Sequence, residues 1–277
     1  MIVRTPAVSG SFYYHDKGML FEQVGECVNP KAKKIEACGI VVPHAGFMYS
    51  GKVAGAVYSQ IKMPDTFVIL GPNHTGFGGD FSLMPSGTWR MPLGDVRIDS
   101  NLAEGVVKNS RFIDLDDSAH LREHSIEVQL PFMQYFSDRF QIVPIAVRHY
   151  PPKQDFLEAC IDVGNAIAEA VKGLKELVVI VASTDFTHYE SQKKAEENDK
   201  SALDAILALD AKRLFKEVDE RDISMCGYGP VAVMLTACIK LGCSKARLVK
   251  YMTSGDTTGD YRQVVGYGGV IIENRSD

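Results

Sequence analysis

The stretch Leu177–Glu190 reads LVVIVASTDFTHYE and joins an apolar run to a polar segment. The apolar half is continuous and rich in β-branched residues, a pattern typical of a strand that is buried on both faces of a sheet. The polar half carries Asp185 and His188 just past the end of that strand. In open parallel sheets, ligands bind outside the carboxyl ends of the strands. This stretch therefore predicts both a layered fold and the edge of the sheet at which its site lies.

Similar apolar runs recur along the chain, and segments with helical periodicity lie between them. The runs are Cys38–Val42, Thr66–Leu70, Gln141–Val147, Arg247–Met252 and Gln263–Ile272. The helical segments include Asp155–Lys172, Lys193–Leu207 and Val231–Leu241. Because strands alternate with helices, we predict an α/β sandwich with a mixed, mostly parallel central sheet flanked by helices. We find no repeat or linker, so a single domain over residues 1–277 is expected.

Two local features refine this prediction. The last two runs are close in sequence, which favours an antiparallel pair. Turn signals at Gly87 and Gly94 indicate that Phe81–Asp99 forms a hairpin over one end of the sheet.

The composition excludes several classes of protein. The chain has 277 residues, of which 45% are hydrophobic and 23% charged, and its formal net charge is −5. No Lys/Arg run stands out, so we expect no nucleic-acid partner. We see neither a signal peptide nor an apolar run long enough to span a membrane. The six cysteines form no C-x-x-C pair and their spacing suggests no disulfide framework, so a cytoplasmic location is expected.

Two more strand exits carry histidine. The run Cys38–Val42 leads directly into PHAGFMYSG, which contains His44, and Thr66–Leu70 leads into GPNHTGFGG, which contains His74. Together with Asp185 and His188, these residues predict one cleft at the carboxyl ends of the strands. The alternative is that each is a solvated loop histidine. The motif GFGG lacks the rest of a nucleotide fingerprint, so no dinucleotide cofactor is expected.

Cys226 stands out among the cysteines. It precedes Gly227, Gly229 and Pro230 and then an apolar helical segment, and proline fits the first turn of a helix. A thiol near a helix N-terminus has a lowered pKa, which suits a nucleophile or a metal ligand. A buried inert thiol is the alternative.

The stretch His120–His124, HLREH, matches the H-x-x-E-H pattern of inverted zinc peptidases. That pattern requires a regular helix, whereas Ser125 resembles a helix start and Pro131 limits a continuous helix. We therefore interpret the match as an accident. His124 and Glu127 are expected to line the cleft, and His120 to be solvated.

The chain resembles the Memo family, which is often called the AmmeMemoRadiSam system protein B group in bacteria and archaea. The resemblance covers nearly the whole chain and rests on AVSGSFYY, VPHAGFMYSG, GPNHTG, EHSIEVQLPF, STDFTHY and MCGYGP. It implies a fold similar to that of the class III extradiol dioxygenases, which use non-haem Fe(II). It also implies a metal site formed by His44, His74 and Cys226, with Asp185 and His188 as a further pair of site residues.

The implied ligand set departs from the two histidines and one carboxylate of the extradiol enzymes. A thiolate is softer than a carboxylate, so the set suits Cu or Zn at least as well as Fe(II), and copper has the highest raw affinity. We expect a bound metal ion, with Fe(II) or Cu favoured and Zn possible. His188, with His124, is a candidate acid/base, and Asp185 is expected to orient His188 or a ligating imidazole.

Three functions remain open. The first is a metal-dependent oxidoreductase, dioxygenase-like, that acts on a small-molecule substrate. The second is a non-catalytic adaptor that binds a ligand or a phosphopeptide, and the third is a zinc-dependent hydrolase. The family's bacterial name further implies pathway partners, a radical-SAM protein and an AMMECR1-like protein.

Secondary expectations concern the surroundings of the cleft. Tyr13, Tyr14 and Tyr49 are candidate cleft walls, with ordinary packing as the alternative. Asp256 and Asp260 lie in SGDTTGDY, which does not match the spacing of a calcium loop and is expected to be a solvated turn.

Overall fold

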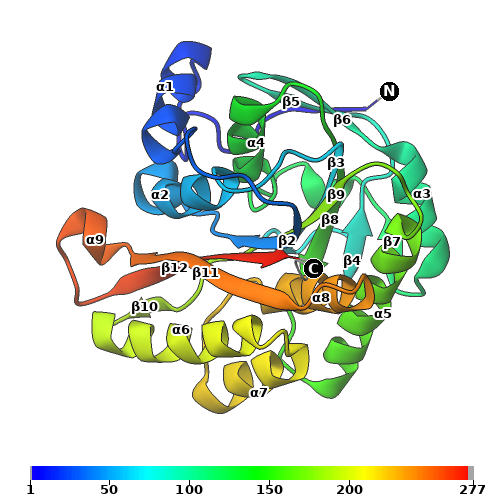
Figure 1. Ribbon diagram of the computed structural model, residues 1–277. Coiled ribbons are helices and arrows are strands. Elements are labelled where there is room, and N and C mark those ends of the chain that lie inside the picture. Colours follow the sequence, from blue (N-terminus) through cyan, green and yellow to red (C-terminus); the bar gives the residue numbers. More distant parts are fainter. Residues whose placement is uncertain (1, 274–277) are drawn as a thin grey trace.

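The structure is a computed structural model that describes residues 2–273. Four parallel strands form the centre of its mixed sheet, in the order β8 (Gln141–Arg148), β3 (Thr66–Asn73), β9 (Val178–Ser183) and β2 (Ala37–Val42). Figure 1 shows these strands side by side, with helices above and below them. The predicted α/β fold with a mostly parallel central sheet is therefore confirmed. The predicted extent of the domain includes residues 1 and 274–277, which lie outside the described residues.

Antiparallel strands complete the sheet beyond β2. The long strand β12 (Val264–Glu273) pairs with β2, and β11 (Lys245–Thr253) and β10 (His188–Glu190) pair antiparallel with β12. The predicted antiparallel pairing of the last two runs is thus confirmed. The single-turn helix α9 (Gly255–Thr258) joins β11 to β12.

Short strands extend the sheet beyond β8. In the region predicted to form a hairpin, β5 (Thr88–Met91) and β6 (Gly94–Ile98) form an antiparallel pair. The strand β6 pairs with β8, and β1 (Val3–Arg4) pairs with β5. On a separate branch, β4 (Phe81–Leu83) pairs with both β8 and β7 (Ile113–Leu115).

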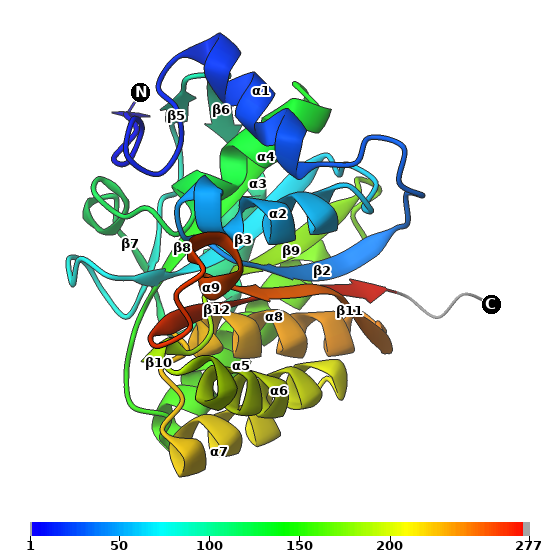
Figure 2. The same ribbon diagram turned by 90° about the vertical axis from the view of Figure 1, so that its left-hand side faces the viewer.

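Helices cover both faces of the sheet (Figure 2). One face carries α1 (Lys17–Cys27), α2 (Phe47–Tyr58) and α4 (Leu130–Phe136). The other carries α3 (Ser100–Asn109), α5 (Gln154–Val171), α6 (Gln192–Leu207), α7 (Ala211–Arg221) and α8 (Tyr228–Lys240). The helices predicted at Asp155, Lys193 and Val231 correspond to α5, α6 and α8, and Pro230 lies in the first turn of α8.

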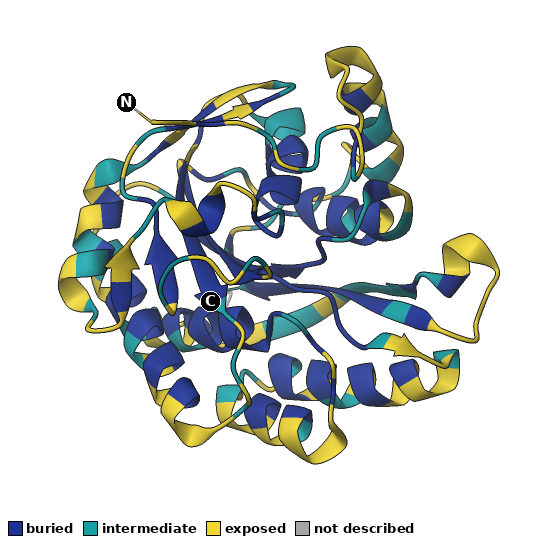
Figure 3. Ribbon diagram, turned by 180° about the vertical axis from the view of Figure 1, so that it is seen from behind, coloured by how far each residue is buried: buried dark blue, intermediate teal, exposed yellow. Residues whose placement is uncertain are grey.

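The strand sequences explain why the sheet has a hydrophobic core on each face. Successive side chains of a strand point to opposite faces. In β3, Val68 and Leu70 pack into the core beneath α5 and α8, whereas Phe67 and Ile69 pack beneath α2 and α4. Figure 3 accordingly shows the central strands as buried and the outer faces of the helices as exposed. The continuous apolar runs therefore supply both cores at once.

The expectation of no disulfide is wrong. Cys38 in β2 and Cys243 after α8 are joined by a disulfide, with Cα atoms 6.6 Å apart. The two residues are 205 positions apart in sequence, so no local spacing could indicate the pairing. Within residues 2–273, no helix combines the length and hydropathy needed to cross a bilayer.

His120 is buried rather than solvated. Its ring lies 5.8 Å from the ring of Trp89, and its Nε2 bonds the carbonyl of Ser82 at 2.9 Å. Burial lowers the pKa of His120 to about 4. His120 lies in the short 3₁₀ helix η1 (Ser118–His120) and His124 lies outside any helix, so HLREH lacks the geometry of a peptidase motif.

Candidate metal centre

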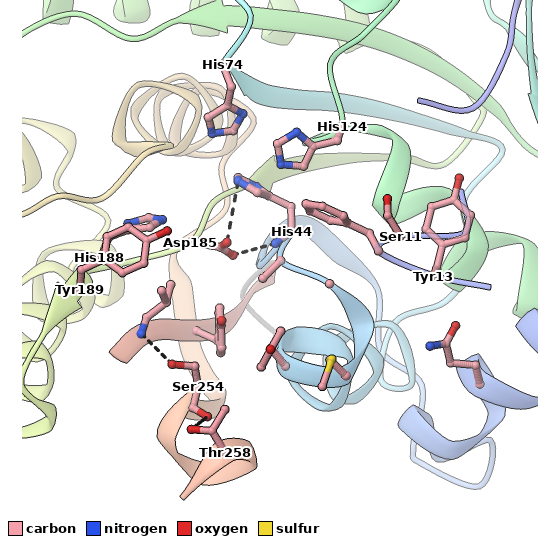
Figure 4. A pocket seen from close by; sticks show the side chains of 18 of the residues that line it. Ser11, Tyr13, His44, His74, His124, Asp185, His188, Tyr189, Ser254 and Thr258 are labelled. Atoms are coloured by element: carbon pink, nitrogen blue, oxygen red, sulfur yellow. Dashed lines mark hydrogen bonds and ion pairs between the residues drawn. The ribbon is translucent and has the colours of Figure 1, made fainter. Parts of the chain in front are cut away.

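A cavity of about 930 Å³ lies at the carboxyl ends of the central strands. His44, His74 and Asp185 enter it from the ends of β2, β3 and β9. His124 enters from the segment before the 3₁₀ helix η2 (Glu127–Gln129), and His188 begins β10. Figure 4 shows His44, His74 and His124 facing one another at one end of the cavity. The convergence expected of the strand exits is therefore present.

The three histidines form a cluster that could hold a metal ion. Each offers one ligand atom, and these atoms lie within 4.8 Å of one another. The rings of His74 and His124 are stacked with centroids 4.8 Å apart, and the ring of His44 meets both edge-on. Imidazole nitrogens suit Zn, Cu and Fe. Two of the three, His44 and His74, are predicted ligands, whereas His124 is predicted to have a catalytic role.

One buried carboxylate holds two of these imidazoles. Oε1 of Glu123 lies 3.0 Å from Nδ1 of His74 and 3.2 Å from Nδ1 of His124. The backbone N–H groups of His74, His124 and Ser125 also donate to this carboxylate. Both rings therefore turn Nε2 away from Glu123, as expected of ligating histidines whose other nitrogen is held by a carboxylate.

The charges of this trio are coupled. Burial raises the pKa of Glu123, but its hydrogen bonds to His124 and His74 and their charges outweigh burial and hold that pKa well below its usual range. Burial likewise lowers the pKa of His74, yet the contacts with Glu123 and the charge of Asp185 raise it overall. Glu123 is thus an anion that compensates positive charge at the cluster.

His44 is the most enclosed of the three. Its backbone N–H donates to Oδ1 of Asp185 at 2.8 Å, and its Nδ1 lies 3.0 Å from Oγ of Ser183. Burial, followed by the charges of His74 and His124, lowers the pKa of His44 well below its usual value. His44 is therefore neutral, which is the form that binds metals.

Cys226 lies beside His44. Its Sγ is 3.4 Å from Nε2 of His44 and accepts the backbone N–H of Asp185 at 3.3 Å. The expectation of a lowered thiol pKa is wrong, since burial and the charge of Asp185 raise it. The first N–H of the turn, on Gly227, already donates to Oγ1 of Thr184, so the helix end stabilises a neighbouring hydroxyl rather than the thiol.

Asp185 and His188 have separate partners. Oδ1 of Asp185 accepts the backbone N–H of His44, and its Oδ2 lies 4.0 Å from Nε2 of the same residue. Burial raises the pKa of Asp185. Nδ1 of His188 instead bonds the carbonyl of Ser224 at 2.8 Å. Asp185 thus contacts His44 through the backbone N–H, and its expected role of orienting an imidazole stays a prediction.

Comparison with known proteins places the chain in a family. A family profile described as Memo-like protein matches residues 4–271. A MEMO1 family protein of Methanothermobacter thermautotrophicus is 43% identical, with 96% of this chain and 99% of the relative covered. One of Methanosarcina mazei is 44% identical, with 99% of this chain and 100% of the relative covered. One of Methanocaldococcus jannaschii is 43% identical, with 98% of this chain and 99% of the relative covered.

The chain belongs to the Memo-like family. Nearly full-length coverage on both sides means that the Memo-like region includes the histidine cluster, Cys226 and Asp185. The names of these relatives state no activity. The roles of the individual site residues in this Memo-like protein therefore stay predictions.

Aromatic side chains form much of the wall of the cavity. Tyr13, Tyr14 and Tyr49 line it as expected, and the ring of Phe12 meets that of His124 at 4.9 Å. Asp260 also lines it, and its bonds with Arg262 lower the pKa of Asp260 to about 2. It thus contributes to the pocket instead of forming only a solvated turn.

Glu127 does not line the Memo-like pocket, contrary to expectation. It is fully buried and bonds the guanidinium of Arg4, with which it forms an ion pair. The hydroxyl of Tyr13 also donates to it, at 2.5 Å.

The sequence analysis missed Glu123. This residue lies inside the rejected HLREH match, and its contact with His74 spans 49 positions. The available signal was a carboxylate directly before a histidine in a loop.

Proposed function

We propose that this Memo-like protein is a metal-dependent oxidoreductase that acts on a small molecule. The observation that carries the proposal is the set of donors at the pocket end. Three imidazoles form a cluster, and a thiol lies 3.4 Å from Nε2 of the central one. The three imidazoles line the cavity, and two histidines with one cysteine are the donor set of redox-active copper sites.

The residues present fit a metal ion. As the cluster stands, His44, His74 and His124 would be the ligands. Cys226 lies beside His44 but outside that cluster, so a set of His44, His74 and Cys226 would require these side chains to shift. Fe(II) or Cu is favoured and Zn is the next candidate. When bound, iron or copper would supply one-electron redox chemistry at the end of the pocket. If Cys226 were a ligand, the hydrogen bond from the N–H of Asp185 to its Sγ would tune the redox potential of the metal.

His188 is the proposed acid/base. The carbonyl of Ser224 can only accept, so the ring hydrogen of neutral His188 lies on Nδ1. Its Nε2 is then free to take a proton from a substrate hydroxyl in the cavity that His188 lines. The aromatic walls, among them Tyr49 and Phe12, would pack against an apolar part of the substrate.

A zinc-dependent hydrolase is the second candidate. Three histidines with an accessible side are a known catalytic zinc set, and His44, His74 and His124 form such a cluster. In that case Cys226 would not be a ligand. The two candidates therefore differ in which variant loses the metal.

A phosphopeptide adaptor ranks third. Proteins recognise phosphate mainly with arginine clusters. Among the described residues, the lining of the pocket contains no arginine or lysine. The radical-SAM and AMMECR1-like partners are proposals that rest on the family resemblance. A cytoplasmic location is a proposal from the sequence, and the disulfide between Cys38 and Cys243 removes one of its grounds.

The test is the metal content of the protein purified without oxygen, measured by mass spectrometry for wild type, His124→Gln and Cys226→Ser. Cys27→Ser is the matched control, because Cys27 is also a free, half-buried cysteine but packs against the core beneath α2, whereas Sγ of Cys226 lies 3.4 Å from Nε2 of His44. Near-stoichiometric Fe or Cu that Cys226→Ser loses and Cys27→Ser keeps supports the oxidoreductase and calls for a screen of oxygen uptake.

The other outcomes count against the proposal. Zinc that Cys226→Ser keeps and His124→Gln loses would favour the hydrolase. No metal in wild type even after reconstitution would overturn both metalloenzyme candidates and leave a binding protein.

A further inference from the structure

The oxygen beneath His44 belongs to Ser183, the last residue of β9. Its side chain is fully buried. Oγ donates to the carbonyl of Ser125 at 2.6 Å, accepts Nε2 of Gln129 at 2.9 Å and lies 3.0 Å from Nδ1 of His44. A single hydroxyl therefore has three close polar neighbours in a site closed to solvent.

A count of hydrogens fixes the direction of each bond. A serine hydroxyl has one hydrogen and can accept twice. The carbonyl of Ser125 can only accept, so it takes that hydrogen. The amide of Gln129 is oriented by two further bonds, because its Nε2 donates to the carbonyl of Pro43 and its Oε1 accepts from the hydroxyl of Tyr58. Gln129 therefore donates to Ser183 and cannot accept from it.

One bond remains, and its direction follows. With its hydrogen used at Ser125, Oγ of Ser183 can only accept from the ring of His44. The hydrogen of neutral His44 must then lie on Nδ1, which leaves the lone pair of Nε2 facing His74, His124 and Cys226. Glu123 has the same effect on the other two rings, but it does so as an anion, whereas Ser183 is neutral.

We propose that Ser183 is a positioning residue that holds the hydrogen of His44 on Nδ1 and so keeps Nε2 available to a metal. Gln129 donates to Ser183, and Tyr58 fixes the orientation of the Gln129 amide. The consequence for metal affinity rests on the proposed function, but the position of the hydrogen does not.

The first test is nitrogen NMR of the full-length, metal-depleted protein labelled with ¹⁵N-histidine. We expect His44 in wild type to be a single tautomer with hydrogen on Nδ1, and in Ser183→Ala to be a mixture of both. Ser183→Thr keeps a hydroxyl and should restore the single tautomer. Ser59→Ala is the matched control, because Ser59 is equally buried and bonds only the backbone of Gly55 and Asn29.

Hydrogen on Nε2 of His44 in wild type would overturn the proposal without any variant, so a failure of Ser183→Ala to fold does not protect it. An unchanged tautomer in folded Ser183→Ala would overturn it as well.

The second test is competitive titration with Zn(II). Loss of a group that orients a ligating histidine costs about 10–100-fold in metal affinity. We expect that loss in Ser183→Ala, recovery in Ser183→Thr and no comparable loss in Ser59→Ala. An equal loss in Ser59→Ala would show a general structural effect and overturn the positioning role. If wild type binds no metal, the proposed function fails while the NMR result still decides the role of Ser183.

Discussion

Two buried glutamates, four positions apart, serve different parts of the molecule. Glu123 and Glu127 are each at most 1% exposed. Glu123 accepts from the imidazoles of His74 and His124 at the pocket. Glu127 pairs with Arg4 and accepts the N–H groups of Ala7 and Val8, and so fastens the N-terminal segment to the fold.

The difference shows that burial of a carboxylate does not reveal its role, whereas its partners do. A guanidinium is always charged and cannot bind a metal, so the pair of Glu127 with Arg4 is structural. An imidazole held at one nitrogen can use the other, so the contacts of Glu123 prepare ligands. Variants at the two glutamates should therefore separate stability from metal binding.

The largest expected effect is on stability, in Arg4→Met. This change leaves Glu127 as an uncompensated buried charge, and breaking a buried pair from one side costs about 3–5 kcal/mol. Urea denaturation should show that loss in the free energy of unfolding. The double variant Arg4→Met/Glu127→Gln should recover part of it, because the amide removes the charge. No recovery would mean that packing of Arg4 against Trp89, 4.3 Å from its ring centroid, matters more than charge.

The next effect is the response of the Arg4 region to acid. The carbonyl of His120 accepts from Arg4, and the pKa of the buried His120 is lowered from about 6.5 to about 4. Between these values the unfolded chain binds a proton and the folded protein does not. The stability contributed by neutral His120 is therefore fully present above about pH 6.5 and is lost as the pH falls towards 4. The loss is about 3 kcal/mol, at about 1.4 kcal/mol per pKa unit.

The measurement is the free energy of unfolding from about pH 7 to about pH 4.5 in wild type and His120→Asn. The variant should be less stable at neutral pH and lose less on acidification, so the two curves should converge. Parallel curves would contradict the lowered pKa. Other buried groups, among them His44, titrate in both proteins and cancel in the difference.

The smallest effect, and the one that tests the comparison most directly, is Glu123→Gln. The amide is neutral, and with its oxygen at the two imidazoles its NH2 group would face the backbone N–H of His74, so Zn(II) affinity should fall by about 10–100-fold, equivalent to about 1.4–2.7 kcal/mol. Glu127→Gln is the matched control and should keep its affinity, because Glu127 bonds Arg4, Tyr13 and the N-terminal backbone and not the metal cluster. Equal losses of affinity in both variants would remove the distinction between the two glutamates.

The sequence predicted those features that depend on short-range patterns. The β-branched runs indicated the central strands because each must be apolar on both faces. The placement of His44, His74 and Asp185 at strand exits predicted their meeting, since the carboxyl ends of parallel strands share an edge.

Features that depend on pairs far apart in the chain could not be predicted. Glu127 and Arg4 are 123 positions apart, and no local sequence pattern around either residue indicates the pairing. His124 was expected in the cleft, but its place beside His74 follows from their shared partner Glu123. Cys226 was correctly placed near the site, yet its pKa depends on burial and on Asp185, which the local helix signal does not contain.

The disulfide has a consequence for refolding. Cys38 and Cys243 close a covalent ring that contains His44, His74, His124, Asp185, His188 and Cys226. In the oxidised chain these residues stay on one closed loop even after denaturation, so fewer conformations separate them. An oxidised, denatured chain should therefore reassemble the pocket faster than a reduced one, in which the four free thiols of Cys27, Cys160, Cys226 and Cys238 compete for Cys38 and for Cys243.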